Sequence, residues 1–238
     1  MAGGGGLIMI PALMIGGLPV STAVATNKLC GTSGTFTSSL KFVLGKNVDW
    51  DACAYMGIPA IFGSVIGSRL IGFLPKEWAE PMVLALLIMI TLFVLSNPTF
   101  GMEGTQAAPA AVKQPSRWRI AKLAISGLVI GFHDGFFGPG AGTFLVFVLI
   151  SVCSLDFLRG TGSAKIINFM TNVTALISFL YLGLIDFPKG VVGAIGVAIG
   201  SYSGATFATK KGATAIKPVF VFVTFILIGK LVIDFFRG

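Results

Sequence analysis

Apolar runs long enough to cross a lipid bilayer follow one another along almost the whole chain. A helix needs about 20 residues to cross the hydrocarbon core. Runs of this kind cover residues 19–44, 49–74, 78–97, 117–136, 157–182, 186–208 and 214–236. Only 11% of the 238 residues are charged, whereas a soluble domain carries about 25%. So few charges cannot cover a soluble surface, and the sequence therefore predicts an all-α polytopic membrane protein.

The chain contains one pattern twice, with an offset of 137 residues between the copies. Without gaps, this offset aligns Lys28 with Lys165 and Asp49 with Asp186, and it also aligns two Gly-Ser-x-x-Gly runs. Apolar matches alone would say little in such a composition. Matched lysine, aspartate and glycine residues in one register indicate an internal duplication, which is typical of secondary transporters.

The duplication divides the chain into a first transmembrane repeat at 1–97, a polar linker at 98–116 and a second repeat at 117–238. Each repeat is expected to hold one glycine-broken or re-entrant helix and three transmembrane helices. The run 117–136 maps to positions before residue 1, so we expect the first repeat to lack its opening helix. Basic residues divide most unevenly between the two sides of the membrane if each repeat makes an odd number of crossings, which predicts inverted repeats.

Two short apolar runs, 7–15 and 140–153, follow clusters of glycine and are too short to cross the bilayer comfortably. Glycine lets the backbone approach a ligand closely, and the helix that follows presents unpaired N–H groups at its positive end. We therefore predict that these breaks bind an anion. The glycines concerned are Gly4, Gly5, Gly6, Gly140 and Gly142. The alternative is helix packing by small residues, which we expect where glycine recurs every four residues, at 127, 131 and 135 and at 196, 200 and 204.

Lys28 and Lys165 each lie near the middle of a long apolar run. A lysine at mid-membrane costs at least about 3 kcal/mol on insertion scales, so each is predicted to bind substrate or to couple transport to protons. The alternative is a lysine that pairs with a carboxylate and holds helices together. Asp134 is the obvious carboxylate in these runs, and one acid cannot fully pair two lysines.

Polar residues beside the two lysines are candidate substrate ligands, because they could donate hydrogen bonds to an oxyanion. They are Thr26, Asn27, Ser163, Asn168 and Asn172. The alternative is hydrogen bonding between helices. Next to the second glycine cluster, His133 and Asp134 are candidates for a proton relay. Asp134 alternatively braces the helix break by bonding free backbone N–H groups.

The remaining composition excludes several other classes of protein. The net charge of +8 would suggest nucleic acid in a soluble protein, but the basic residues lie in short connections and set topology instead. One histidine and three cysteines without a C-x-x-C pair give no metal motif, so we expect no metal and no cofactor. No nucleophile–base set is visible, so we expect no enzyme.

The run AGGGGLIMIPALMIGGLPVSTAVATNKL at 2–29 resembles the sulfite exporter (TauE/SafE) family, also called the toluene-sulfonate uptake permease family. The run GFHDGFFGPGAGTF at 131–144 is similar to the second-repeat motif of that family. The resemblance covers the whole chain and is greatest to an uncharacterised branch of bacterial inner-membrane transporters. It implies a multi-pass protein of the bacterial inner membrane whose substrates are anions such as sulfite and organosulfonates. The family normally has an apolar helix before the glycine run, and we expect this chain to depart from the family there.

The sequence therefore predicts a secondary transporter that carries small anions by alternating access. Sulfite, organosulfonates or related organic anions are the expected substrates. The expected partners are this anion, the lipid bilayer, a coupling proton or cation and a second copy of the chain, with no nucleic acid. The alternatives are a passive anion channel and a non-transporting membrane protein or truncated, inactive fragment.

Overall fold

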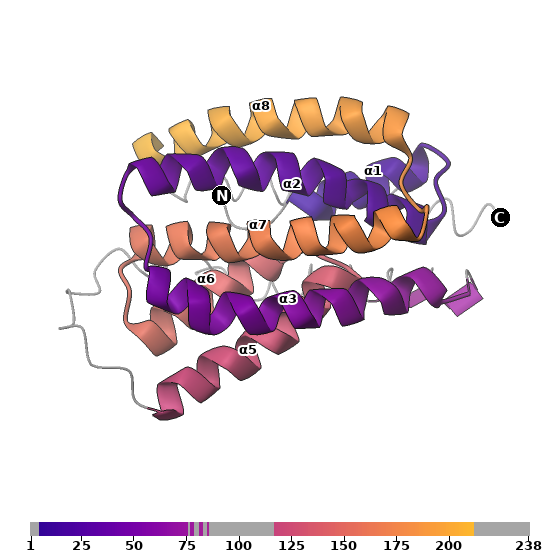
Figure 1. Ribbon diagram of the computed structural model, residues 1–238. Coiled ribbons are helices and arrows are strands. Elements are labelled where there is room, and N and C mark those ends of the chain that lie inside the picture. The colour runs from indigo at the N-terminus through magenta and orange to yellow at the C-terminus, as the bar shows by residue number, and fades with distance from the viewer. Residues whose placement is uncertain (1–4, 76, 79–80, 83–84, 86–116, 212–238) are drawn as a thin grey trace.

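The computed structural model describes residues 5–75, 77–78, 81–82, 85 and 117–211, and all regular secondary structure within them is helical (Figure 1). The helices are α1 (Gly5–Ile15), α2 (Val20–Leu44), α3 (Trp50–Phe73), α5 (Arg117–Phe136), α6 (Ala141–Cys153), α7 (Phe157–Tyr181) and α8 (Phe187–Lys211). The predicted all-α class is therefore confirmed for this part of the chain.

Each predicted span that falls in the described part forms one helix, namely α2, α3, α5, α7 or α8. The two short runs form the short helices α1 and α6. The predicted span 214–236, the linker 98–116 and most of the span 78–97 lie outside the described residues. Among the described residues, two helices are long and apolar enough to cross a membrane, Trp50–Phe73 and Leu158–Tyr181.

Aspartates fix where three of the helices begin. Asp49 caps α3 and Asp156 caps α7, because their carboxylates accept hydrogen bonds from backbone N–H groups of the first turn. Asp186 does the same before α8 and lies 3.0 Å from the backbone nitrogen of Lys189 and 3.3 Å from its ammonium. The backbone bond first, and then the lysine charge, hold the pKa of Asp186 below its ordinary value. The cap is thus charged at neutral pH, and its contribution to stability is lost only as the pH falls through this lowered pKa.

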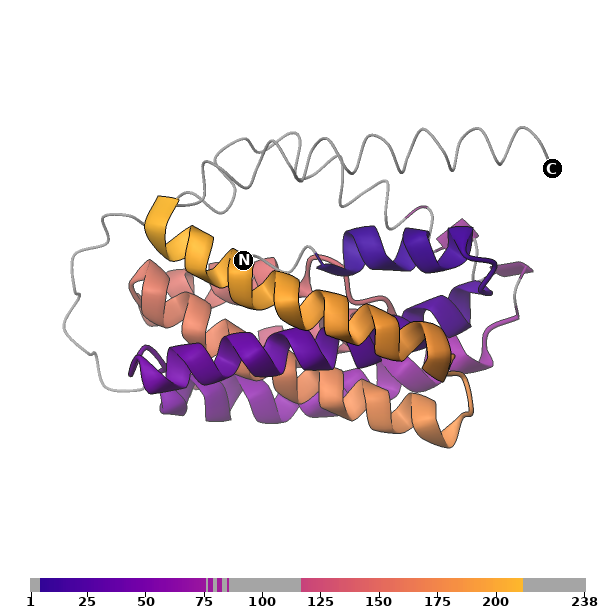
Figure 2. The same ribbon diagram turned by 90° about the horizontal axis from the view of Figure 1, so that it is seen from above.

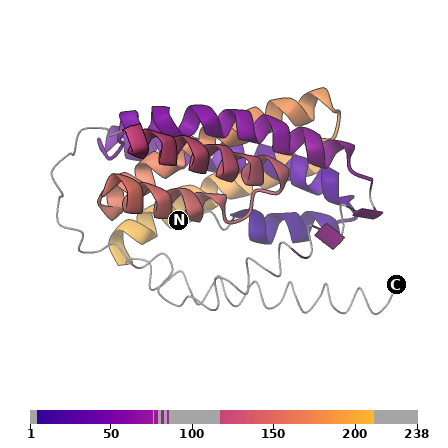
Figure 3. The same ribbon diagram turned by 90° about the horizontal axis from the view of Figure 1, so that it is seen from below.

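The five long helices form a row in the order α8, α2, α7, α3 and α5 (Figure 1). α1 packs against α2, whereas α6 packs against α7 and α5. Figures 2 and 3 show α1 and α6 on the same face of this row. The row does not follow the order of the chain, because α2 is covered by α8 and α7 is covered by α3. The two central helices, α2 and α7, therefore meet in the middle of the molecule.

Many large apolar side chains are exposed, and the largely apolar interior also holds several polar side chains. Large apolar side chains are exposed along the outer faces of α3, α5 and α8, including Phe62, Val129 and Ile199. Polar side chains are buried between the helices, including Lys28 and Asp134. A surface of this kind is stable in lipid, where exposed apolar groups need no water and polar groups must find partners inside the protein.

Glycines join α3 and α5 at very short range. A side chain added at Gly127, Gly131 or Gly135 of α5 would overlap a backbone carbonyl of α3, and one at Gly63 or Gly67 would overlap a carbonyl of α5. The predicted packing role of the first three glycines is confirmed. At Gly196 and Gly200 of α8, no atom of the described residues lies within 4 Å of the side-chain position. The expectation of a helix contact is not met there within the described part.

Candidate functional site

Lys28 is buried in the middle of the helix row and forms an ion pair with Asp134. The lysine nitrogen lies 2.9 Å from Oδ1 of Asp134, and the side chains are only 1% and 3% exposed. α2 supplies the lysine, and the last turn of α5 supplies the aspartate. A buried charge is tolerated when an opposite charge compensates it. For Lys28, the structure thus shows the lysine–carboxylate pair that the sequence left as an alternative.

The second oxygen of Asp134 accepts a hydrogen bond from the hydroxyl of Thr171 on α7. The backbone carbonyl of Thr171 in turn accepts a hydrogen bond from Ser64 of α3, at 2.8 Å. Asp134 therefore braces this region through the side chains of Lys28 and Thr171. The alternative drawn from the sequence was a brace through backbone N–H groups. Thr171 was not singled out from the sequence, although it lies three residues after Asn168 and so shares the polar face of α7.

The glycine break between α5 and α6 lies directly over the lysine. Gly138 and Gly140 have φ angles of +99° and +84°, which glycine adopts without strain. A side chain at Gly138 would lie 2.9 Å from the ammonium nitrogen of Lys28. Gly140 is the N-cap of α6 and Gly142 is buried in its first turn. The absence of a side chain at Gly138 is therefore what lets the charged end of Lys28 reach the break.

The first glycine cluster reaches the same place. α1 begins at Gly5, and a side chain at Gly6 would lie 3.2 Å from Nδ2 of Asn27 and 3.2 Å from Pro139. The start of α1, the break before α6 and the centre of α2 therefore meet around Asn27 and Lys28. Gly4 lies outside the described residues.

The predicted amides of α7 line the opposite side of this site. Nδ2 of Asn172 donates to the backbone and side-chain oxygens of Asn168, each at 2.7 Å. Oδ1 of Asn172 lies 3.2 Å from the side-chain position of Gly31, one turn after Lys28 on α2. Lys165 is partly buried on α7, one turn before Asn168. The polar faces of α2 and α7 therefore face each other at this contact.

The hydroxyls of Thr26 and Ser163 have structural partners. Thr26 accepts a hydrogen bond from the backbone N–H of Asp186 at 3.0 Å, and Ser163 accepts one from the backbone N–H of Asp49 at 2.8 Å. Both contacts join a central helix to the start of the helix that covers it. The geometry favours the alternative of bonding between helices over the role of substrate ligand.

The side chain of His133 packs against aromatic rings, unlike that of its neighbour Asp134. Its ring meets the rings of Phe137 and Phe144 edge-on, at centroid distances of 6.1 and 5.9 Å. Its buried Nδ1 has no hydrogen-bond partner among the described residues. Consecutive residues on a helix do not face each other, so no direct bond links His133 to Asp134. Across the described ranges, no group of three His, Cys, Asp or Glu side chains is arranged to hold a metal ion.

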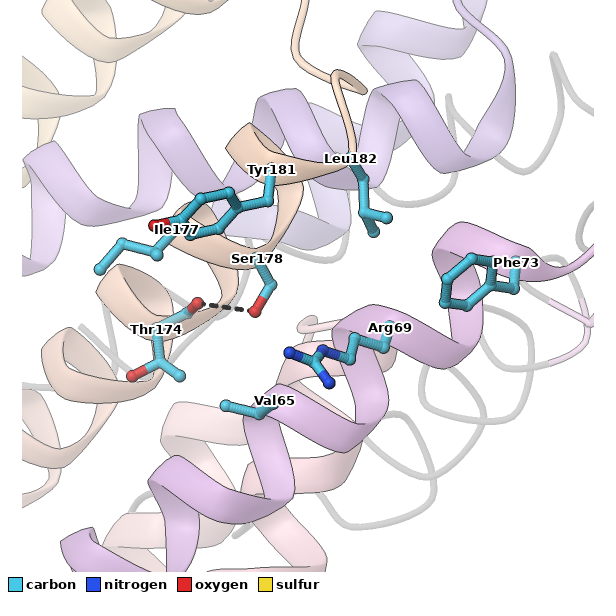
Figure 4. Close-up of a pocket in the computed structure, with 8 residues that line it drawn as sticks. All are labelled: Val65, Arg69, Phe73, Thr174, Ile177, Ser178, Tyr181 and Leu182. Carbon is cyan, nitrogen blue, oxygen red and sulfur yellow. Dashed lines mark hydrogen bonds between the residues drawn. The ribbon is translucent and has the colours of Figure 1, made fainter.

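A cavity of about 450 Å³ opens between α3 and α7 (Figure 4). Its lining is mostly apolar, with Arg69 as its charged residue, and includes the hydroxyl-bearing residues Thr174 and Ser178. None of the predicted site residues lines it. Thr174 nevertheless lies three residues after Thr171, which is about 4.5 Å along the helix axis. The candidate site is the buried ion pair, where charge is held away from water, and the cavity shares helix α7 with it.

Comparisons with known proteins identify the family of the chain. The family model for "Sulfite exporter TauE/SafE" matches residues 1–231. The chain is 30% identical to the probable membrane transporter protein YfcA of Escherichia coli K12, over 98% of this chain and 84% of the relative. It is 32% identical to probable membrane transporter proteins of Haemophilus influenzae and of Sinorhizobium, over 98% of this chain and 89% and 87% of the relatives.

No solved structure matches the chain, so the assignment depends on the family model and on these relatives. The family model covers nearly the whole sequence, including both glycine breaks and both lysines. The chain therefore belongs to the TauE/SafE sulfite exporter family.

Proposed function

We propose that this protein is a secondary transporter of small anions, such as sulfite or organosulfonates, in the bacterial inner membrane. The observation that carries the proposal is a buried lysine ammonium where two glycine breaks and two central helices meet. Membership of the sulfite exporter family and the names of the transporter relatives support the same reading.

The substrate anion binds at the charged end of Lys28. Asn27 and the backbone around Gly6 and Gly138 surround this point, and half-helix starts near the membrane midplane suit an anionic group. Asn168 approaches from α7 and completes the site when the two central helices move. In this site, fixed N–H donors and positive charge take the place of the water that hydrates the oxyanion in solution.

Two inverted repeats build this site. α2 and α7 span residues 20–44 and 157–181, so both their bounds differ by 137. The two helices run in opposite directions across the molecule, as do α3 and α8 (Figure 1). Basic residues gather at one end of the row, where α2 and α8 end and α5 and α7 begin. This asymmetry supports the odd number of crossings that inversion requires.

The units that move are not the repeats themselves. One unit is α2 with α1 and α8, and the other is α7 with α3, α5 and α6. α2 also packs against α7, and the boundary between the two units runs there. Each unit thus contains the outer helix of the other repeat, and Lys28 and Thr171 lie on either side of the boundary. Rocking of one unit against the other opens the site to alternate sides of the membrane.

Flux into proteoliposomes that contain the full chain tests the proposal. We expect labelled sulfite, methanesulfonate or benzenesulfonate to enter and to show counterflow, in which unlabelled anion inside accelerates uptake of label. A conductance without counterflow would indicate a channel instead. No flux of any of these anions would contradict the proposed function.

Arg69 is expected to concentrate anions at the cavity between α3 and α7. A cation in a low-dielectric cleft raises the local concentration of anions. The Arg69→Gln variant should therefore raise the KM for the anion by roughly threefold to tenfold, with little change in maximal flux and a smaller effect at high salt. Arg159→Gln is the control, since Arg159 is exposed at the start of α7. An equal KM in Arg69→Gln and wild type would exclude this role.

A further inference from the structure

Lys28, the lysine of the proposed anion site, is already paired with an anionic group, the carboxylate of Asp134. Oδ1 of Asp134 lies 2.9 Å from the ammonium of Lys28, at the distance and in the place that a substrate oxygen would take. Neither residue lines the cavity between α3 and α7 or the one between α1 and α8. A substrate oxygen that binds at this position therefore takes the place of the carboxylate.

Charge balance decides what happens to the displaced carboxylate. Lys28 and Asp134 together carry no net charge, and both are almost fully buried. A monovalent anion that entered alone would leave the site with one uncompensated negative charge, which is costly in a buried environment. Uptake of one proton by Asp134 returns the site to zero net charge. Loss of that proton when the anion leaves returns it to zero again.

Thr171 can satisfy Asp134 in both protonation states. Its hydroxyl donates to Oδ2 of the ionised carboxylate and lies 3.1 Å from a second acceptor, the carbonyl of Asn168. A hydroxyl both donates and accepts. When Asp134 is protonated, Thr171 can donate to Asn168 and accept the hydrogen bond of the carboxylic acid. The switch requires rotation of one hydroxyl and no movement of a helix.

The other ionisable groups on α5 and on the helices around it form no hydrogen bond or ion pair with Asp134 among the described contacts. His133 is its neighbour on α5, and Lys165 lies six residues before Thr171 on α7. The thiol of Cys30 on α2 faces Gly190 of α8. The rest lie in the first or last two turns of α2, α3, α5, α6 and α7, namely Lys41, Asp51, Cys53, Tyr55, Arg69, Arg117, Arg119, Lys122, Cys153, Arg159 and Tyr181. Lys28 is thus the charged group in contact with Asp134.

From this geometry we infer that Asp134 is the proton-carrying residue of the transporter. One proton from water binds the carboxylate as one monovalent anion replaces it at Lys28, so the anion and the proton cross the membrane together. On release, the proton returns to water and the carboxylate pairs with Lys28 again. This inference rests on the proposed function and adds the identity of the coupling ion.

Methanesulfonate is the probe that isolates this step. Sulfite can itself carry a proton near neutral pH, whereas a sulfonate stays ionised, so any proton that accompanies it is carried by the protein. Proteoliposomes with a pH-sensitive dye inside report the proton, and labelled methanesulfonate reports the anion. We expect inward methanesulfonate flux to acidify the interior. A pH gradient of about one unit, acid outside, should support up to about a tenfold accumulation.

Asp134→Asn is the decisive variant, because the amide resembles the protonated acid but cannot release a proton. We expect it to lose acidification and pH-driven accumulation while still exchanging anion for anion. Asp51→Asn is the matched control, since Asp51 is exposed in the first turn of α3, and it should accumulate anion as wild type does. A His133→Phe variant tests the neighbouring histidine and should keep the coupling.

The outcomes separate the two proposals. No anion flux by wild type would contradict the proposed function itself. Flux without acidification, or accumulation by Asp134→Asn equal to wild type, would overturn the assignment of Asp134 and leave the transporter intact. Loss of coupling in His133→Phe but not in Asp134→Asn would move the proton to the histidine. If Asp134→Asn proves too unstable to test, Thr171→Val should lower pH-driven accumulation while anion exchange persists, and wild-type accumulation in it would overturn the inference.

Discussion

Lys28→Met is expected to abolish anion transport and to destabilise the folded protein by about 3–5 kcal/mol, because it leaves the buried carboxylate of Asp134 unpaired. The double variant Lys28→Met/Asp134→Asn removes both charges and should regain most of the lost stability, since a neutral pair can replace a buried ion pair at little cost. Transport should stay absent in the double variant, because the substrate still lacks its cation. Thermal unfolding in detergent and anion flux in proteoliposomes measure the two effects separately.

The surface pair of Lys189 and Asp186 provides the control for this experiment. Its ammonium and carboxylate lie 3.3 Å apart, but the lysine side chain is 44% exposed. Lys189→Met should therefore change stability and transport little. Recovery of transport together with stability in the double variant would show that Lys28 only holds helices together. Full stability of the single variant would contradict the energetic argument from burial.

Gly131→Ala is expected to disrupt the contact between α3 and α5. The added methyl group would overlap the backbone carbonyl of Ala60, and a backbone atom cannot turn aside as a flexible side chain can. Since even overpacking in an adaptable core costs about 1–3 kcal/mol, we expect a loss at the upper end of that range or beyond. The displaced α5 also carries Asp134 away from Lys28. A lower unfolding temperature and reduced flux should therefore appear together.

Gly196→Ala is the matched substitution on α8. No described atom lies within 4 Å of its side-chain position, and alanine favours a helix over glycine by about 1 kcal/mol. Stability equal to or slightly above wild type is expected. If Gly131→Ala unfolds at the same temperature as Gly196→Ala, the close approach of α3 and α5 does not stabilise the protein.

The sequence is informative about the helices and about which of their residues are unusual. Apolar runs of fixed length place α2, α3, α5, α7 and α8 within a few residues, because the bilayer dictates their length. Lys28 stands out because a charge in such a run is costly. Its pairing with Asp134, 106 residues away, depends on the tertiary structure. The sequence only offers Asp134 as the available carboxylate.

The hydrogen-bond partners of hydroxyl groups cannot be predicted from residue types alone. Thr26 and Ser163 were predicted as substrate ligands, yet both accept hydrogen bonds from the backbone before α8 and α3. Thr171 looks like any threonine in a helix, yet it bonds to Asp134. A hydroxyl can donate, accept or bond to its own helix, and tertiary packing decides between these. The pairing of α2 with α8 and of α7 with α3 is likewise set by packing.

Each central helix is covered by a helix of the other repeat. The first repeat is therefore synthesised before the helices against which it packs. α2 and α3 leave the ribosome well before α7 and α8 have been made, although these later helices are the ones that cover them. During that interval, Lys28 and the other polar groups of α2 have none of their final partners from α5, α7 and α8. Until the second repeat has been made, the nascent first repeat must therefore remain in the insertion machinery or in a loosely packed state in lipid. Chains severed in the linker at 98–116 could form the site only by assembling both pieces together.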